Sequence, residues 1–262
     1  MNQEEPLVLR HDRADGLTTL TLNRPGQFNS LSVAMLSALQ AELDAIARSE
    51  AVRVVVIGGA GRAFCAGHDL KEMRADCRKE TMQALFRQCG DLMLTITRLP
   101  QPVIARVHGI ATAAGCQLVA TCDLAVAADV ARFAVSGINV GLFCSTPAVA
   151  LARNLGRKAA LEMLLTGDFI DALEARAKGL VNRVVPADAL DAEIERLAAS
   201  ILAKSAVAVR AGKGMFYRQL EMPQNEAYAY ASEVMACNMM SEDALEGIDA
   251  FMQKRKPVYS GR

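Results

Sequence analysis

Two glycine- and alanine-rich turns each follow an apolar, strand-like segment, and both could bind a ligand through backbone amides. The first turn runs from Gly61 to Leu70 and the second from His108 to Cys116. Small side chains let a ligand approach the backbone, and a helix that starts after such a turn has N–H groups without an internal acceptor. Two such donors converging from separate turns would form an oxyanion hole for a carbonyl oxygen that gains charge. The alternative is that the small residues only allow close packing of a helix on a strand.

Reactive side chains lie in and near these turns. His68 lies in the first turn, and an imidazole ordinarily titrates near neutral pH. Cys144 would need a lowered pKa and a neighbouring base to act as a nucleophile, and no residue adjacent in sequence supplies them. Asp69 and Asp123 are carboxylates that could instead bond turn amides. For all four side chains, a structural role is the simpler interpretation.

Metal and redox cofactors are not predicted. The three histidines lie in unrelated segments without metal-ligand spacing, and no GxGxxG fingerprint follows a strand.

Composition limits the partners and the compartment. The 262 residues are 52% apolar and carry 29 basic and 29 acidic side chains, so no broad basic surface is expected for nucleic acid or an anionic membrane. The apolar stretch 107–128 is interrupted by polar residues, which favours a buried strand, helix and strand over a membrane span of about 20 residues. Seven cysteines without a CxxC pair and a polar, acidic N-terminal segment predict reduced thiols in a cytoplasmic protein.

Periodic apolar residues predict an α/β core followed by helices. Strands are expected at 18–22, 52–57, 102–107, 124–127 and 181–185, and helices at 157–165, 172–178, 188–204 and 205–256, with Ser32 capping a further helix and Pro223 breaking the last one. A strand, a helix and a strand within 102–128 form the crossover unit of a parallel sheet. We expect a β-rich core over residues 1–190 and a helical region over 191–262.

The motifs of the two turns, taken with others along the chain, resemble the enoyl-CoA hydratase/isomerase (crotonase) superfamily. The resemblance covers nearly the whole chain in order. The matching segments are Asn23-Arg24-Pro25, Asn29-Ser30-Leu31, Phe64-Cys65-Ala66-Gly67-His68-Asp69-Leu70, Pro102-Val103-Ile104-Ala105, His108-Gly109, Gly115-Cys116-Gln117-Leu118, Cys122-Asp123, Glu246-Gly247-Ile248-Asp249-Ala250-Phe251 and Lys254-Arg255-Lys256-Pro257.

The resemblance implies an α/β fold, a crotonase-like spiral of repeated ββα units with a helical C-terminal trimerisation region. It implies self-association into a trimer or a dimer of trimers, and an acyl-coenzyme A ligand with no further cofactor. The thioester oxygen would be held by the backbone N–H groups of His68 and Ala114, where alanine replaces the usual glycine and keeps the N–H. The implied coenzyme A contacts are Arg24, Phe28, Ala66, Gly67, His68, Asp69 and Leu70, with Phe251 and Lys254 reaching a neighbouring subunit's ligand.

The chain departs from the family pattern at both hydratase glutamates. Gln117 occupies the first position and Gly137 the second. An amide orients a water but cannot take its proton, and loss of a positioned acid or base costs about 100- to 10,000-fold in rate for each group. Efficient hydration and glutamate-dependent isomerisation are therefore not expected. Ser136, Asn139 and Cys144 flank the expected acyl pocket and could contact a polar acyl group.

Three functional hypotheses remain open from the sequence, all within acyl-CoA or fatty-acid metabolism. One is an enzyme that uses the oxyanion hole alone, such as an acyl-CoA decarboxylase or thioesterase, since family decarboxylases also carry histidine at the position of His68. The second is a lyase with weak enoyl-CoA hydratase activity. The third is an acyl-CoA-binding regulatory protein without catalysis.

Overall fold

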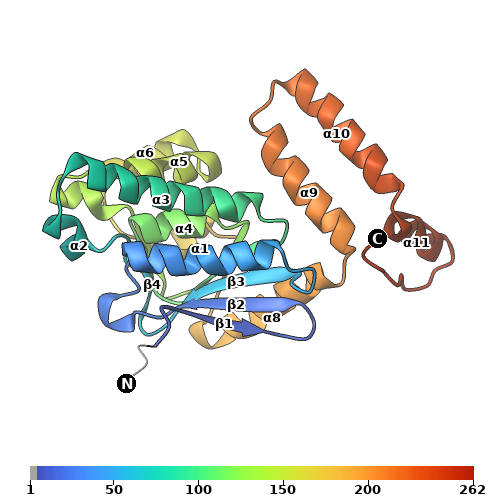
Figure 1. The fold of residues 1–262 in the computed structure, drawn as a ribbon, viewed down its shortest axis with the longest axis horizontal. Helices are drawn as coiled ribbons and strands as arrows, with labels where there is room; N and C mark the ends of the chain where they lie inside the picture. The colour runs from blue at the N-terminus through green and yellow to red at the C-terminus, as the bar shows by residue number, and fades with distance from the viewer. Residues whose placement is uncertain (1–4) are drawn as a thin grey trace.

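Two β-sheets form the centre of the molecule (Figure 1), which the computed structural model describes over residues 5–262. The start of the expected core region, residues 1–4, lies outside the described residues. The larger sheet has the strand order β1-β2-β3-β5-β7-β10 and the smaller one β4-β6-β8-β9. Pairing is parallel except for β1 with β2 and β8 with β9. The strands are β1 Val8–Asp12, β2 Leu17–Leu22, β3 Val54–Gly59, β4 Ala63–Cys65, β5 Val103–Val107, β6 Ile110–Thr112, β7 Leu124–Ala128, β8 Arg132–Ala134, β9 Ile170–Asp171 and β10 Arg183–Val185.

Helices cover both faces of the larger sheet. The α-helices are α1 Val33–Ala47, α2 Leu70–Ala75, α3 Lys79–Arg98, α4 Ala114–Thr121, α5 Ser145–Asn154, α6 Arg157–Thr166, α7 Ala172–Lys178, α8 Leu190–Leu202, α9 Ala206–Gln219, α10 Gln224–Met239 and α11 Glu242–Met252. Short 3₁₀ turns occupy Pro25–Gln27 (η1), Ser136–Val140 (η2) and Ala187–Ala189 (η3). As predicted, Ser32 caps α1, with its Oγ accepting from Met35 N at 3.1 Å.

Strand β3 shows how the sequence builds two hydrophobic cores. Successive side chains of a strand point to opposite faces. Val55 and Ile57 therefore join the large core with α1, α3 and α4, whereas Val54 and Val56 pack with α8 on the other face. Because both faces are covered, the strand is apolar at every position, as expected for a buried parallel sheet.

The chain alternates between the two sheets in a spiral. Strands β3, β5 and β7 of the larger sheet are each followed by a short strand of the smaller sheet (β4, β6 and β8), and a helix comes next. This arrangement confirms the predicted repeat of ββα units. It also brings the chain after β4 and the chain after β6 to the same region, because β4 and β6 are paired in parallel.

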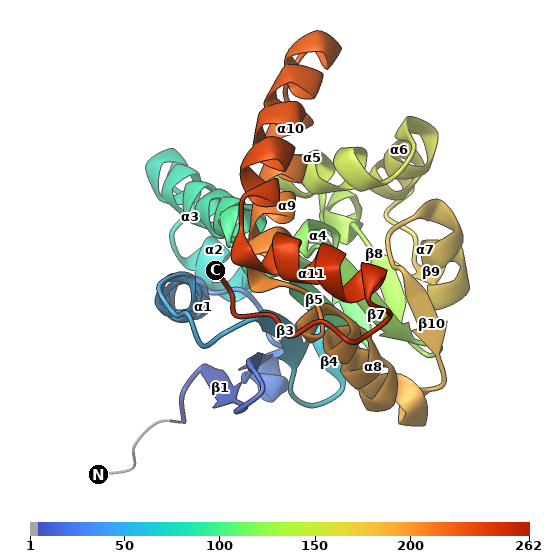
Figure 2. The same cartoon turned by 90° about the vertical axis from the view of Figure 1, so that its right-hand side faces the viewer.

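The last three helices form an arm that projects from the core (Figures 1 and 2). Helix α9 packs against α3 and α10, and neither α9 nor α10 contributes an apolar residue to the buried core. The predicted boundary after residue 190 is not where the structure divides, because Leu190, Ile194 and Leu197 of α8 pack on the larger sheet. The arm begins at Ser205. Its exposed apolar side chains are Phe216, Leu220, Tyr228, Met235, Met239, Met240, Leu245, Ile248, Phe251 and Met252.

A buried ion pair joins the arm to the core. Lys213 Nζ on α9 lies 2.6 Å from Asp123 Oδ2 and also donates to the carbonyls of Ile96 and Gln101, both at 2.9 Å. Tyr217 donates from its hydroxyl to Asp123 Oδ1 at 2.8 Å. Only 7% of the Lys213 side chain is exposed, so the hydrogen-bonding groups of this cluster are committed to one another. The predicted structural role of Asp123 fits this geometry.

Candidate functional site

The two glycine-rich turns meet at backbone contact distance. A Cβ atom built on Gly67 would lie 2.8 Å from the Cβ of Ala113 and 3.1 Å from the amide nitrogen of Ala114. A Cβ on Gly115 would overlap the carbonyl oxygen of Cys65. Glycine is therefore required for close packing of the two turns. The same packing sets the amide of Ala114 beside Gly67, the residue that precedes His68. Close packing of the turns and a backbone amide available to a ligand are therefore compatible here.

The amides of His68 and Ala114 have no acceptor among residues 5–262. Ala114 begins α4, and the first helical bond of that helix runs from Gln117 N to Ala113 O at 3.0 Å. A helix start leaves its first N–H groups for other acceptors. All eight residues of α4 are buried, so solvent does not replace the missing acceptor as readily as at an exposed helix end.

Ala113 holds the turn before α4 in a strained conformation. Its φ of 50° and ψ of −121° lie in a region that residues with a side chain rarely adopt. Such strain costs about 1–3 kcal/mol and persists where the surrounding structure enforces it, often at functional sites. Here Ala113 is held by a hydrogen bond from its N to Ala134 O at 3.0 Å, on strand β8. The strained residue sets the direction of the free amide of Ala114.

The imidazole of His68 lies between Leu31, which precedes α1, and Phe86 of α3. Its Nδ1 lies 3.3 Å from the carbonyl oxygen of Leu31, and its ring meets the Phe86 ring edge-on with centroids 5.5 Å apart. The Nε2 atom is buried and has no partner among residues 5–262. Burial lowers the pKa of His68, against the smaller opposing effects of the Leu31 carbonyl and the charge of Glu72.

Gln117, predicted to stand at the position of the first hydratase glutamate, lies one turn into α4 from Ala114. Its side chain is 3% exposed, and its Oε1 atom is buried without a hydrogen-bond partner among the described residues. Residues three apart lie on the same face of a helix, so the side chains of Gln117 and Ala114 share a face of α4. The amide can orient a polar group but cannot act as an acid or a base at neutral pH.

At Gly137, predicted to stand at the position of the second glutamate, neighbouring atoms leave no space for a side chain. A Cβ built on Gly137 would lie 2.5 Å from the carbonyl oxygen of Leu142 and 2.7 Å from Cys144 Sγ. The backbone there is fixed by a hydrogen bond from Leu142 N to Gly137 O at 2.9 Å. No larger side chain fits at residue 137 unless this loop shifts. Burial raises the pKa of the Cys144 thiol, which opposes a role as a thiolate nucleophile.

The other predicted acyl-pocket residues bond to protein atoms. Ser136 Oγ lies 2.8 Å from Thr112 Oγ1, so it ties η2 to the end of β6. Asn139 Nδ2 donates to Gly167 O at 3.4 Å. Both side chains support the loop, and their partners are far away in sequence, so the motif did not indicate these contacts.

Most of the predicted coenzyme A contacts gather around η1 and α2. Both Nη atoms of Arg24 lie 3.3 Å from Asp69 Oδ2, and Ala66 N donates to Phe28 O at 3.0 Å. Asp69 caps α2 by accepting from Lys71 N and Glu72 N at 3.1 and 3.3 Å. Burial raises the pKa of Asp69, but the Glu72 and Lys71 amides and Arg24 outweigh it and hold that pKa below its usual value. Leu70, the first residue of α2, is exposed.

Arg62 is a residue that the sequence did not single out. Its guanidinium lies over the Phe28 ring, 4.4 Å from the centroid, at the edge of the first turn. The sequence signal that could have identified it is the presence of an arginine in the turn from Gly61 to Leu70. The pair adds a cation and an aromatic face beside the predicted coenzyme A contacts.

Phe251 and Lys254 do not meet the other site residues within one chain. They lie on and just after α11, which packs against α9 and α10 at the far end of the molecule from α2 (Figure 1). Phe251 is 84% exposed. A role at the ligand therefore requires a second copy of the chain, as the resemblance implies.

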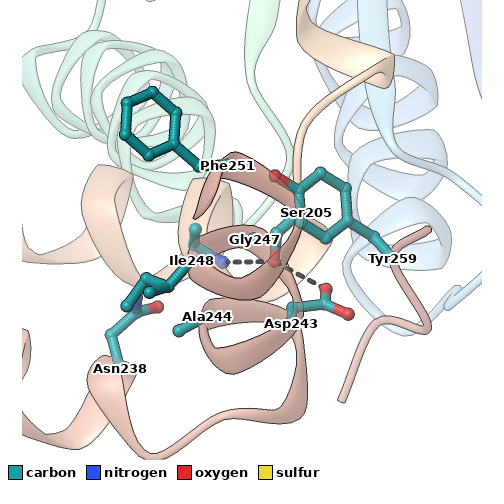
Figure 3. Close-up of a pocket in the computed structure, with 9 residues that line it drawn as sticks. Ser205, Asn238, Asp243, Ala244, Gly247, Ile248, Phe251 and Tyr259 are labelled. Carbon is teal, nitrogen blue, oxygen red and sulfur yellow. Dashed lines mark hydrogen bonds between the residues drawn. The ribbon is translucent and has the colours of Figure 1, made fainter. Parts of the chain in front are cut away.

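Two cavities lie outside the paired turns. One of about 320 Å³ is bounded by α9, α10 and α11, and Figure 3 shows Ser205, Asp243 and Tyr259 on its wall. Asp243 accepts from Ser205 Oγ at 2.7 Å and from Ser260 N at 2.7 Å, so it holds the C-terminal segment against the arm. A second cavity of about 440 Å³ lies beside Lys213 and Tyr217.

Two kinds of feature are absent from residues 5–262. No group of three or more His, Cys, Asp or Glu side chains is arranged to hold a metal ion. None of the helices described is both long and apolar enough to cross a membrane.

Comparisons with known proteins agree on one family. The family model described as Enoyl-CoA hydratase/isomerase matches residues 12–262. Enoyl-CoA hydratase domain-containing protein 3, mitochondrial, of mouse is 46% identical over 259 residues, which cover 99% of this chain and 86% of that protein. The 2,3-dehydroadipyl-CoA hydratase of Escherichia coli K12 is 35% identical over 98% of this chain and 99% of that protein.

Solved structures give the same result. The crystal structure of an enoyl-CoA hydratase from Mycobacterium smegmatis matches with a TM-score of 0.96 and 61% identity, covering 97% of this chain and 99% of that one. Human enoyl coenzyme A hydratase domain-containing protein 3 matches with a TM-score of 0.93 and 46% identity, covering 97% and 100%.

Proposed function

The chain belongs to the enoyl-CoA hydratase/isomerase family, and from this membership we propose that it binds an acyl-coenzyme A thioester without catalysing efficient hydration. The backbone N–H groups of His68 and Ala114 would hold and polarise the thioester oxygen. One observation carries the proposal: these two amides lack acceptors in a buried region where two separate turns are packed together. Such preorganised donors stabilise charge that develops on an oxygen.

The neighbouring side chains support coenzyme A as the carrier of the acyl group. Arg24 and Arg62 supply positive charge beside η1, and Phe28 supplies an aromatic face. Phosphate groups and an adenine ring would find complementary partners in guanidinium groups and aromatic rings. Because Arg24 is already paired with Asp69, its guanidinium is held in one orientation before any ligand arrives.

The proposed lack of efficient hydration rests on both glutamate positions. Gln117 offers no base, and the space beside Gly137 contains Leu142 O and Cys144 Sγ. Each missing group accounts for about 100- to 10,000-fold in rate. The hole alone could still stabilise an enolate or a tetrahedral intermediate, so an acyl group that reacts without a protein carboxylate would be a substrate.

We also propose self-association into a trimer or a dimer of trimers. The arm exposes a run of apolar side chains over α9, α10 and α11, and large exposed apolar patches mark interaction surfaces. Assembly would also bring Phe251 and Lys254 to the ligand of another copy. A cytoplasmic location stays a prediction, since the mouse relative is named as mitochondrial.

Calorimetric binding of butyryl-CoA and of free coenzyme A tests the proposal, together with a crotonyl-CoA hydration assay. We expect both ligands to bind, butyryl-CoA more tightly because its thioester oxygen adds hydrogen bonds, and hydration to be at least about 10,000-fold below an enzyme with both carboxylates. Absence of binding by both ligands would refute coenzyme A recognition. Rapid hydration would show that another group replaces the glutamates.

A further inference from the structure

The side-chain amide of Asn29 is buried against the start of the first glycine-rich turn. Asn29 is 0% exposed, and its Nδ2 donates to three backbone carbonyls, those of Ala60 at 2.9 Å, Ala63 at 2.8 Å and Phe64 at 3.2 Å. Its Oδ1 accepts from Arg24 N at 2.9 Å. A primary amide has two N–H groups, so the three carbonyls share both donors and every polar atom of the side chain is engaged.

Gly59, the last residue of β3, leaves the space that this amide occupies. A Cβ atom built on Gly59 would lie 2.7 Å from Asn29 Nδ2 and 2.5 Å from Phe64 O. Asn29 itself has a φ of 55°, in the left-handed region where asparagine is enriched among residues that carry a side chain. Both residue types are therefore needed to bring the amide to these carbonyls.

Two of the three carbonyls belong to a β-bulge in β4. Ala63 and Cys65 pair with two adjacent residues of β6, so Phe64 between them is an extra residue without a register partner. A bulge leaves its extra residue unpaired and disrupts the ladder locally. Asn29 supplies a donor to the carbonyl of that extra residue and to the carbonyl before it. The side chain therefore stabilises the bulge.

The bulge decides which residues of the two turns face each other. Continued from Cys65 and its partner on β6, the register sets His68 opposite Ala114. The register before the bulge, continued from Ala63, would set His68 opposite Gly115 instead. A slip of one residue also turns the side chains of a strand to its other face.

Contacts on both sides of the first turn agree with the register after the bulge. On one side, Leu31 N donates to Gly67 O at 2.8 Å, and Leu31 forms a parallel bridge with His68. On the other side, a Cβ built on Gly67 would lie 2.8 Å from the Cβ of Ala113, the pair that this register gives. Asn29 lies two residues before Leu31, so the segment that carries the amide also runs beside the turn.

Resting on the function proposed above, we propose that Asn29 is a positioning residue for the oxyanion hole, because its amide holds the bulge of β4 in the register that sets the N–H of His68 beside the N–H of Ala114. The Asn29 side chain is wholly buried, so it acts on the thioester through the backbone of β4. Without its donors, the carbonyls of Ala63 and Phe64 no longer hold the bulge, and the His68 amide moves out of line with that of Ala114.

The ratio of the affinities for butyryl-CoA and free coenzyme A tests this role, since only the thioester has the oxygen that the hole binds. Asn29→Asp keeps the shape of the side chain and the acceptor for Arg24 N, but an oxygen then faces the three carbonyls. We expect calorimetry to show a fall of about 2- to 15-fold in this ratio, the worth of one hydrogen bond. Asn29→Gly also removes the donors and tolerates the left-handed backbone, so it should lower the ratio as well.

Gln101→Glu is the matched control. Gln101 is 4% exposed, and its Nε2 donates to the carbonyls of Ile46 and Ser49 at 3.0 and 3.2 Å, at the end of α1. The same exchange of amide for acid should lower the free energy of unfolding there and leave the affinity ratio unchanged. A change in the ratio is thereby separated from a general loss of stability.

The outcomes distinguish this role from the underlying function. Asn29 variants that keep the ratio of the unmodified protein, including an equal loss for both ligands, would overturn the positioning role and leave the hole intact. A fall of the same size in Gln101→Glu would overturn it too. If the unmodified protein binds butyryl-CoA no more tightly than free coenzyme A, the hole itself fails, and the positioning role with it. Should Asn29→Asp not fold, Asn29→Gly decides by the same ratio.

Discussion

A Cβ atom on Gly137 would lie 2.7 Å from the sulfur of Cys144, closer than such atoms pack in proteins. The carbonyl oxygen of Leu142 is 2.5 Å from the same point. The space beside residue 137, the predicted position of the second glutamate, is thus filled by the following loop, and glycine is the residue that this loop requires. The substitution Gly137→Glu would have to move the backbone of this loop.

We predict that Gly137 and Cys144 are energetically coupled. Gly137→Ala should lower the free energy of unfolding by about 1–3 kcal/mol because the new methyl group overlaps the thiol and the Leu142 carbonyl. In a Cys144→Ala background the cost should be smaller, since the sulfur is gone. Chemical denaturation of the four proteins of this double-mutant cycle measures the coupling.

Gly156→Ala is the control for that cycle, since a Cβ there meets nothing within 4 Å. It should change the free energy of unfolding by less than about 0.5 kcal/mol. Equal costs for Gly137→Ala in both backgrounds would show that the sulfur does not close the position.

We predict that the amide of Ala114 contributes to thioester affinity. Ala114→Pro removes this N–H at the first position of α4, where proline is tolerated in helices. The affinity for butyryl-CoA should fall about 2- to 15-fold, the worth of one hydrogen bond, whereas free coenzyme A should bind as before. Ala114→Gly retains the N–H and should keep the affinity. An equal loss for both ligands in the proline variant would point to a distorted turn instead.

We predict that Lys213 is needed to hold the arm on the core. Lys213→Met leaves the buried Asp123 carboxylate without its cation, which should cost about 3–5 kcal/mol of stability. Lys158→Met on α6, an exposed lysine, should be close to neutral. Denaturation measures the stability, and hydrogen exchange should show faster exchange in α9 of the Lys213 variant. Unchanged exchange in α9 would contradict the anchoring role.

We predict that stability declines as the pH falls below 6.5. Burial lowers the pKa of both His68 and His108 from the usual 6.5. The unfolded chain therefore binds these protons first, so the stabilisation present above pH 6.5 is lost as the pH falls toward the lowered folded values. Carboxyl groups ordinarily titrate lower, near pH 4, so their effect on stability is separated from that of the two histidines.

Denaturation midpoints at pH 7.5 and 5.5 measure this loss. His68→Gln combined with His108→Gln should flatten the dependence between these two values. A dependence of the same steepness in the double variant would assign it to other groups.

Some elements of the fold are predictable from the sequence and others are not. Strands β3, β5 and β7 of the larger sheet have five or six mostly apolar residues, and Ser32 precedes a clear helical stripe, so the hydrophobic pattern identifies these elements. Strands β4, β6, β8 and β9 have only two or three residues, too few to show a period. Helix α8 is amphipathic, as α11 of the arm also is, and only its packing on the sheet assigns it to the core.

The candidate site likewise has some features that the sequence predicts and others that it does not. The family resemblance predicts His68 and Ala114, whereas the residues alone predict only that the helix starts after the two turns leave amides without an internal acceptor. The contact of His68 with Leu31 joins residues 37 apart, and the closure of Gly137 depends on the path of residues 142–144. Such contacts follow from tertiary packing, which no local pattern encodes.

The most direct test of the oxyanion hole is the thioester carbonyl stretch of bound butyryl-CoA, labelled with carbon-13 at the carbonyl and measured by difference infrared spectroscopy. Two backbone donors withdraw electron density from the C=O bond, so its frequency should fall on binding. The shift should be smaller in Ala114→Pro and retained in Ala114→Gly. A carbonyl frequency equal to that of the free thioester in water, despite binding, would contradict the hole formed by His68 and Ala114.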